Sequence, residues 1–235
     1  IFGTSGVRGV YRESSRTPLA DYAASQIVTP ELGALLGRAF ARALKKRGAG
    51  NLVTLLHDVR PSSLPLAAAV LEGLTAEDVR VEWGGALSTP TATRLRDRAV
   101  VVITASHNPP SENGFKFFSR GHPIDEAFED EVQAIAESLD PAGGLRSGKR
   151  APNVKNVADS LRVATRAALI RDVHSLELTD ALSGKLVVLD LAHGSSATFL
   201  GGHGLLPRLS PGLEALLATG AVVVGFATEQ APDMV

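Results

Sequence analysis

The chain has 235 residues, of which 44% are hydrophobic, so it can bury one large core or two domains. Its 24 Lys and Arg residues nearly balance its 25 Asp and Glu residues, which gives no electrostatic reason to expect nucleic acid or a charged membrane as a partner. The sequence has no cysteine for a disulfide or a thiolate metal site, and no apolar stretch approaches the roughly 20 residues of a membrane span, so we expect a soluble cytoplasmic protein.

The first residues, 2 to 9, form a glycine-rich segment that we interpret as a ligand-binding loop. Its three glycines allow the backbone to approach a ligand closely. Thr4, Ser5 and Arg8 offer hydroxyl groups and a guanidinium group, which suit phosphate oxygens. The alternative is a flexible tail. We interpret residues 10 to 28, which follow, as a longer loop.

Helices and strands alternate between residues 29 and 103. Thr29 is a predicted helix cap with Pro30 at the first helical position, and the apolar residues that follow recur at helical spacing. The other predicted elements are a strand at 52–56, a helix at 64–74, a strand at 79–83, a short helix from Thr89 and Pro90, and a strand at 99–103. This alternation predicts a three-layer α/β/α fold with a mixed, mainly parallel sheet.

The last of these strands leads into the sequence Thr-Ala-Ser-His-Asn-Pro-Pro at residues 104–110. The run from Val100 to Ile103 is apolar throughout, as expected of a strand that is covered on both faces. The Asn-Pro-Pro sequence ends regular pairing, so Ser106 is predicted on a turn at the carboxyl end of the strand. Ligands bind at that edge in open α/β sheets. The alternative is an ordinary polar turn.

A second polar group follows the predicted strand at 52–56. Asp58 and Arg60 come at its carboxyl end and are therefore expected at the same edge as Ser106. They are candidates for ligand binding, although they could instead pair with each other or cap the helix after Pro61. We interpret the neighbouring His57 as a structural residue.

Beyond Ser106 the pattern predicts a return strand at Phe117 and Phe118 and an amphipathic helix over 123–139. Residues 141–152 are rich in Gly and Pro and are the best linker candidate. They divide the chain into a domain at 1–150 and a second unit at 151–235, with a helix near 156–171 and strands at 185–190 and 221–226.

The linker contains a segment like a nucleotide-binding P-loop, but Arg150 stands where Ser or Thr would hold magnesium, so we reject a nucleotide site there.

Four segments in chain order together resemble the α-D-phosphohexomutases, the family of phosphomannomutase, phosphoglucomutase and phosphoglucosamine mutase. Residues 2–9 look like the opening Arg-Gly loop of the family, 58–63 like its Asp-x-Arg loop, 89–90 like its Thr-Pro turn and 104–116 like its phosphoserine loop. The resemblance is strong over residues 1 to about 125. Leu56 and His57 depart from the family's Gly-Arg at these two positions.

The resemblance implies a phosphoryl transfer mechanism. Phosphorylated Ser106 would give its group to a sugar monophosphate, and the resulting bisphosphate would reorient and return its other phosphate. Arg8 would reach the phosphoserine, Lys116 would transfer the proton, and His107 would share that task or position the loop. The other implied substrate-binding or phosphate-binding residues are Thr4, Ser5, Asp58, Arg60, Asn108 and Asn113.

The implied cofactor is Mg²⁺, bound by the phosphate on Ser106 and by aspartates of an Asp-x-Asp-x-Asp-Arg loop. That triplet does not occur in this sequence. We therefore expect residues 1–150 to be domain I of the family and 151–235 to be part of domain II, without the metal loop and without domains III and IV. We expect the 235-residue chain alone to have little or no mutase activity.

The sequence thus predicts a phosphohexomutase of the phosphomannomutase/phosphoglucomutase type, acting on mannose, glucose or glucosamine phosphate. A phosphoglucosamine mutase is the nearest alternative. Two alternatives from other classes are a non-catalytic α/β binding module descended from a mutase and a P-loop nucleotide-binding protein.

Overall fold

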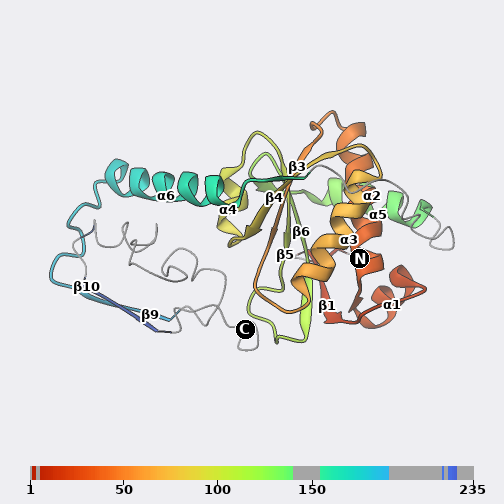
Figure 1. The fold of residues 1–235 in the computed structure, drawn as a ribbon, viewed down its shortest axis with the longest axis horizontal. Coiled ribbons are helices and arrows are strands. Elements are labelled where there is room, and N and C mark those ends of the chain that lie inside the picture. Colours follow the sequence, from red (N-terminus) through yellow and green to blue (C-terminus); the bar gives the residue numbers. More distant parts are fainter. Residues whose placement is uncertain (1, 4–5, 140–153, 191–218, 220–221, 227–235) are drawn as a thin grey trace.

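The computed structural model describes residues 2–3, 6–139, 154–190, 219 and 222–226. In this part of the chain a sheet of eight strands has the order β2-β1-β6-β5-β3-β4-β8, with β7 paired to β6 (Figure 1). Its strands are β1 (Val7–Tyr11), β2 (Ile27–Val28), β3 (Leu52–His57), β4 (Arg80–Ala86), β5 (Ala99–Ile103), β6 (Glu112–Ser119), β7 (His122–Pro123) and β8 (Lys155–Asn156). The helices are α1 (Pro18–Ser25), α2 (Pro30–Lys46), α3 (Ser63–Thr75), α4 (Pro90–Arg94), α5 (Glu126–Ser138) and α6 (Ala158–Ser175).

The sheet is mixed and mainly parallel, which confirms the predicted fold class. β3 pairs in parallel with β4 and β5, β4 with β8, and β1 with β2. β6 is antiparallel to both of its neighbours, β1 and β5. The chain therefore leaves β5 at its carboxyl end and returns along the adjacent strand β6. Residues 104–111 connect the two strands at that end of the sheet.

The two faces of the sheet pack against different helices. Val101 and Ile103 of β5 point into the larger core, which also contains residues of α2, α3 and α5. Val100 and Val102, on the opposite face, belong to a smaller core with residues of α4 and the start of α6 (Figure 1). Both faces of β5 are therefore buried, which explains why this strand is apolar throughout.

The helix predicted from Thr29 is present as α2. The Thr29 hydroxyl accepts a hydrogen bond from the backbone N–H of Leu32 at 3.2 Å, so the predicted cap is confirmed. The helix predicted over 123–139 begins later, at Glu126. The side chain of Asp125 caps it by accepting from the N–H of Phe128 at 2.9 Å, and residues 122–123 instead pair with β6 as β7.

The prediction of a long loop over residues 10–28 is wrong. This segment contains the end of β1, helix α1 and strand β2. The strand is concealed in the sequence because Gly9 replaces a side chain in its centre. A Cβ atom at Gly9 would lie 1.6 Å from the carbonyl oxygen of Gln26, so the close approach of the chain excludes any other residue there.

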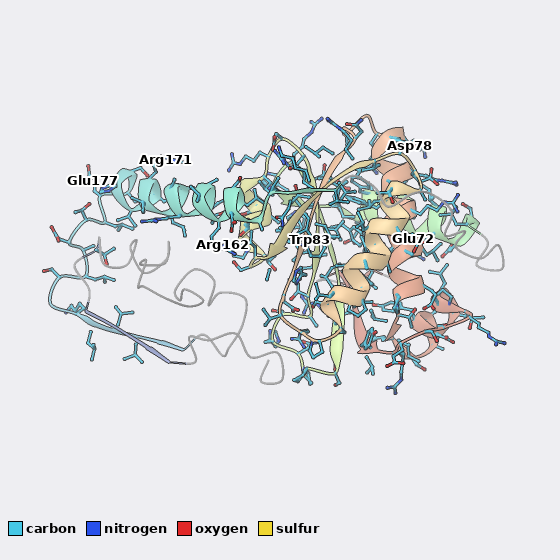
Figure 2. The ribbon with its side chains drawn as sticks, viewed as in Figure 1. Glu72, Asp78, Trp83, Arg162, Arg171 and Glu177 are labelled. Carbon is cyan, nitrogen blue, oxygen red and sulfur yellow. The ribbon has the colours of Figure 1, made fainter. Side chains whose placement is uncertain are left out.

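The second unit of the chain is described in part. α6 leads away from the first sheet, with Arg162 on its nearer half and Arg171 towards its far end (Figure 2). β9 (Leu186–Asp190) pairs in parallel with β10 (Val222–Phe226), as expected for the two strands predicted there. The predicted linker at 141–152 lies outside the described residues, and the division at residue 150 stays a prediction.

Across the described ranges, we find no helix with the length and hydrophobicity needed to cross a membrane.

Candidate active site

Ser106 is exposed in the loop between β5 and β6, which we call the serine loop (Thr104–Ser111). Its backbone has a φ angle of 61°, in the left-handed region that residues with a side chain seldom adopt. The N–H of Ser106 donates to the hydroxyl of Thr104 at 3.0 Å. The Ser106 hydroxyl lies 3.4 Å from Nδ1 of His107, which is also exposed. The oxygen is therefore accessible to a ligand at the carboxyl end of β5.

Arg60 lies beneath this loop with an exposed fraction of only 2%. A guanidinium group has five N–H donors, and here all five contact protein oxygens. Nε donates to the carboxylate of Asp58 at 3.0 Å. The other four N–H groups donate to backbone carbonyls of the serine loop and the first residue of β6, namely those of Ser106 (2.9 Å), Asn108 (2.8 Å), Glu112 (3.1 Å) and Pro109.

Asp58 in turn holds Arg60 in place. One carboxylate oxygen accepts from the backbone N–H of Arg60 at 3.1 Å and from the hydroxyl of Ser63, and the other accepts from Nε. Both residues are thus committed to contacts within the protein. In this arrangement Arg60 has no N–H left for a phosphate, and the phosphate-binding role expected for the two residues stays a prediction. The pairing of Asp58 with Arg60 is the alternative to ligand binding that the sequence left open, and the structure shows this pair.

The two asparagines expected to bind substrate are also committed to the protein. The amide nitrogen of Asn113, which is fully buried, donates to the hydroxyls of Ser62 at 2.8 Å and Ser63 at 3.0 Å. The Asn108 amide donates to the carboxylate of Glu112 at 2.7 Å. Asn113 therefore joins the start of β6 to the start of α3, and Asn108 joins the serine loop to the first residue of β6. Their expected contact with substrate stays a prediction, and the hydrogen bonds seen here are within the protein.

Arg8 lies on β1, and not in a loop as predicted, directly opposite Gly114 of β6. On its other side the Tyr22 hydroxyl accepts from the N–H of Arg8 at 3.1 Å and contacts its carbonyl oxygen at 3.2 Å. Nε of Arg8 is buried and has no hydrogen-bond partner among the described residues. Burial, and then the positive charge of Arg60, lower the pKa of Arg8. An anion would relieve both effects.

Lys116 faces the same side of the sheet as Arg8. It is two residues from Gly114 on β6, and alternate residues of a strand share one face. A Cβ atom at Gly114 would lie 2.9 Å from Cγ of Arg8, so the absence of a side chain there lets the arginine lie over the strand towards Lys116. Burial, and then the charge of Arg8, lower the pKa of Lys116. The two cations therefore form one positive pair, and Gly114 accepts a backbone hydrogen bond from Thr104 of the serine loop at 3.0 Å.

Two predicted site residues, Thr4 and Ser5, lie outside the described residues, and His57, next to Asp58, has the structural role expected of it. His57 is buried, with its ring centre 5.1 Å from that of Trp83 on β4, which Figure 2 labels. Burial lowers the pKa of His57, so its ring is neutral at pH 7 and packs as a structural residue.

Sequence reasoning missed Tyr22, because it assigned residues 10–28 to a loop. The signal was present: Thr17 and Pro18 begin α1 in the same Thr-Pro pattern that begins α2. The hydrogen bonds that Tyr22 makes with the backbone of Arg8 could not be deduced from that pattern, since they join residues 14 positions apart.

The described residues do not form a metal site by themselves. Among them there is no group of three or more His, Cys, Asp or Glu side chains placed to hold a metal ion. A phosphate on Ser106 would supply oxygen ligands that Mg²⁺ accepts.

Comparison with known proteins identifies the family. Residues 1–142 match the family model described as phosphoglucomutase/phosphomannomutase, alpha/beta/alpha domain I. The chain belongs to this family of phosphohexomutases. The match covers β1 to α5 and thus every residue of the site described above.

Curated relatives and solved structures agree with this family. A phosphoglucosamine mutase of Symbiobacterium thermophilum is 31% identical over 99% of this chain, and one of Rhodococcus jostii is 33% identical over 99% of it. The chain covers 46% of each relative, so it spans about half of their length. Among solved structures, a putative phosphomannomutase from Thermus thermophilus is 26% identical, with a TM-score of 0.70 over 100% of this chain and 47% of that one.

Proposed function

We propose that Ser106 is the phosphoryl carrier of a phosphohexomutase that interconverts hexose 1-phosphate and hexose 6-phosphate. The observation that supports this most directly is the exposed Ser106 hydroxyl, held by a fixed loop at the carboxyl edge of the sheet. Arg8 and Lys116 lie on the strands beside that loop, and their positive charges suit the phosphate of a phosphoserine. Family membership supports the same reaction class.

The transfer follows from these groups. The bond between phosphorus and the Ser106 oxygen breaks as a sugar hydroxyl oxygen bonds to phosphorus, and the hydroxyl proton passes to a base. We propose the neutral amine of Lys116 as that base, because its lowered pKa makes the neutral form more abundant near pH 7 than in an exposed lysine. In the return step the protonated amine gives the proton back to the departing sugar oxygen. The departing Ser106 oxygen also takes up a proton, and we propose that His107, beside it, supplies this proton and takes it back when Ser106 attacks in the return step.

We propose an amino sugar phosphate as the substrate, because the curated relatives at 31–35% identity are named phosphoglucosamine mutases. A phosphomannomutase or phosphoglucomutase is the second candidate, supported by the name of the Thermus thermophilus protein. Mg²⁺ is the proposed cofactor of the whole enzyme. Within the described ranges, phosphorylated Ser106 is the one ligand that we assign to it.

The carrier role is tested by intact-mass analysis of the full-length protein and its Ser106→Ala variant. We expect one phosphate on the wild-type protein, none on Ser106→Ala, and loss of mutase activity by at least about 1,000-fold in the variant. Ser111→Ala, which removes another exposed hydroxyl of the same loop, is the matched control and should keep both the phosphate and the activity. An active Ser106→Ala variant would overturn the assignment.

The choice of sugar is tested separately with the same wild-type preparation. Glucosamine 6-phosphate, mannose 6-phosphate and glucose 6-phosphate are compared by kcat/KM. We expect the amino sugar phosphate to be preferred by at least about tenfold, equivalent to roughly 1.4 kcal/mol of transition-state binding. Preference for mannose or glucose phosphate would move the protein to the second candidate and leave the role of Ser106 intact.

A further inference from the structure

We propose that Arg60 and Asp58 are positioning residues for phosphoryl transfer, acting by holding the serine loop and not by contacting the sugar phosphate. The inference rests on the proposed role of Ser106 as phosphoryl carrier. It concerns a buried ion pair at the end of β3, the strand next to β5. The pair lies below the loop and is not itself exposed to a ligand, since the Arg60 side chain has no exposed surface.

The serine loop cannot hold its own shape through backbone pairing alone. Pro109 and Pro110 have no N–H groups, so the loop has more backbone acceptors than donors. Four carbonyls of the loop and of the first residue of β6 converge on Arg60, which supplies the missing donors. The Pro109 carbonyl also accepts from the N–H of Glu112 at 3.0 Å, but without Arg60 the carbonyls of Ser106 and Asn108 would have to turn towards water, because an acceptor without a partner is unfavourable.

Turning the carbonyls outward would change the conformation of Ser106. Its carbonyl oxygen accepts from Arg60 at 2.9 Å, and its N–H donates to Thr104 at 3.0 Å. With both backbone groups held, the residue keeps its left-handed φ of 61° and projects its hydroxyl to the surface. A strained conformation of this kind persists only where its surroundings determine it. Arg60 is therefore the contact that fixes the direction of the reacting oxygen.

Lysine cannot replace Arg60 in this role. An ammonium group has three donors on one nitrogen, whereas the guanidinium group spreads five donors over a plane. Asp58 fixes that plane through Nε and anchors it to the start of α3 through Ser63. The N–H of Asp58 also donates to the carbonyl of Ile103 at 2.9 Å, so the pair joins β3 to the end of β5 from which the loop departs.

The test compares Arg60→Lys with Arg38→Lys in the full-length protein. Arg38 pairs with Glu77 at the surface, away from the serine loop, and is the matched control. We expect Arg60→Lys to lower kcat by about 100-fold with KM changed by less than about twofold, because misplacement of the reacting oxygen affects the transition state and not substrate binding. Arg38→Lys should leave both constants unchanged.

Hydrogen exchange tests the same proposal without reference to activity. In Arg60→Lys the amides of residues 104–112 should exchange at least about tenfold faster than in Arg38→Lys, while the amides of α2 keep their protection. If Arg60→Lys does not fold, Asp58→Asn replaces it, and we expect faster exchange in the same residues together with a reduced kcat.

Three outcomes would overturn the proposal. The first is that both kcat and KM are unchanged in Arg60→Lys. The second is a raised KM with an unchanged kcat, which would place Arg60 in contact with the substrate. The third is unchanged exchange of the loop amides. An active Ser106→Ala variant would instead refute the proposed function, and the exchange measurement would still decide whether Arg60 holds the loop.

Discussion

At the scale of single residues, Ser106 combines a reactive hydroxyl with an unfavourable backbone conformation. A left-handed conformation costs a residue with a side chain about 1–2 kcal/mol. The hydrogen bond from Arg60 to the Ser106 carbonyl involves a charged donor, and such bonds contribute about 1.5–3 kcal/mol. The contact is therefore large enough to offset the conformational cost, and the serine loop can be both strained and well ordered.

Lys116 allows a prediction about stability and pH. Because its pKa is lower in the folded protein than in the unfolded chain, folding is penalised while the amine is protonated in both states. The penalty begins to shrink as pH rises through the folded pKa and is gone above the unfolded pKa. Lys116→Met should therefore raise the free energy of unfolding at pH 7. We expect a gain below about 1 kcal/mol, because the side chain is only half-buried and solvent screens its charge.

The measurement is urea denaturation of dephosphorylated full-length protein at several pH values. The gain from Lys116→Met should shrink as the pH rises towards about 10 and should be absent above the pKa of a free lysine, about 10.4. Lys45→Met, at an exposed position near the end of α2, is the control and should show no such trend. A loss of stability at pH 7 in Lys116→Met would show that the amine is stabilised, not penalised, by its surroundings.

At the scale of elements, α2 and α3 cross at two glycines. A Cβ atom at Gly73 would lie 2.0 Å from the carbonyl oxygen of Ala34, and one at Gly37 would lie 2.6 Å from that of Val70. The backbones of the two helices therefore approach more closely than side chains would permit. This close contact positions the start of α3, where Ser62 and Ser63 support Asn113 and Asp58.

Gly73→Ala should force the two helices apart. We expect a loss of about 1–3 kcal/mol in the free energy of unfolding, because the obstructing atom belongs to the backbone and cannot move independently. Ala68→Ser, at an exposed position on the same helix, should change it by less than about 0.5 kcal/mol. Thermal denaturation followed by circular dichroism measures both. Equal stability of the two variants would mean that the helices can separate without cost.

At the scale of the whole molecule, the chain beyond residue 153 contacts the first sheet through two features. β8 extends the sheet beyond β4, and Val157 and Leu161 enter the smaller core. Leu161 lies close to β4, since a Cβ atom at Gly84 would be 3.0 Å from its Cδ1 atom. An ion pair between Arg94 of α4 and Asp172 of α6 adds a partly exposed contact at 2.7 Å.

Leu161→Ala should weaken this attachment. The loss of a buried leucine side chain typically costs about 2–5 kcal/mol, and we expect the lower part of that range because Leu161 lies at the margin of its core. Val163 is 65% exposed on the same helix, so Val163→Ala should cost less than about 0.5 kcal/mol. Thermal unfolding of the two full-length variants distinguishes them, and indistinguishable midpoints would contradict the attachment.

The sequence by itself determined the class of fold, most of the helices and strands, and the place of Ser106. These depend on local signals: the apolar run before the serine loop, the Thr-Pro helix starts, and the prolines that end pairing. Through the resemblance of their motifs, it also predicted that Arg8 and Lys116 belong to one site, and the structure pairs the two strands that carry them. The strand β1 and helix α1 escaped prediction, because Gly9 interrupts the side-chain pattern of the strand where another backbone approaches it.

Only the tertiary structure decided which polar side chains pair with protein oxygens and which do not. Arg8, Arg60 and Asn113 all carry N–H donors that suit phosphate by residue type. Their roles separate because β3 and β5 are neighbours in the sheet, which places Arg60 beneath the serine loop, 46 residues away along the chain from Ser106. Each N–H group donates to the oxygen atoms that the fold brings within its reach. Which oxygens these are depends on the pairing of distant strands and not on any local pattern.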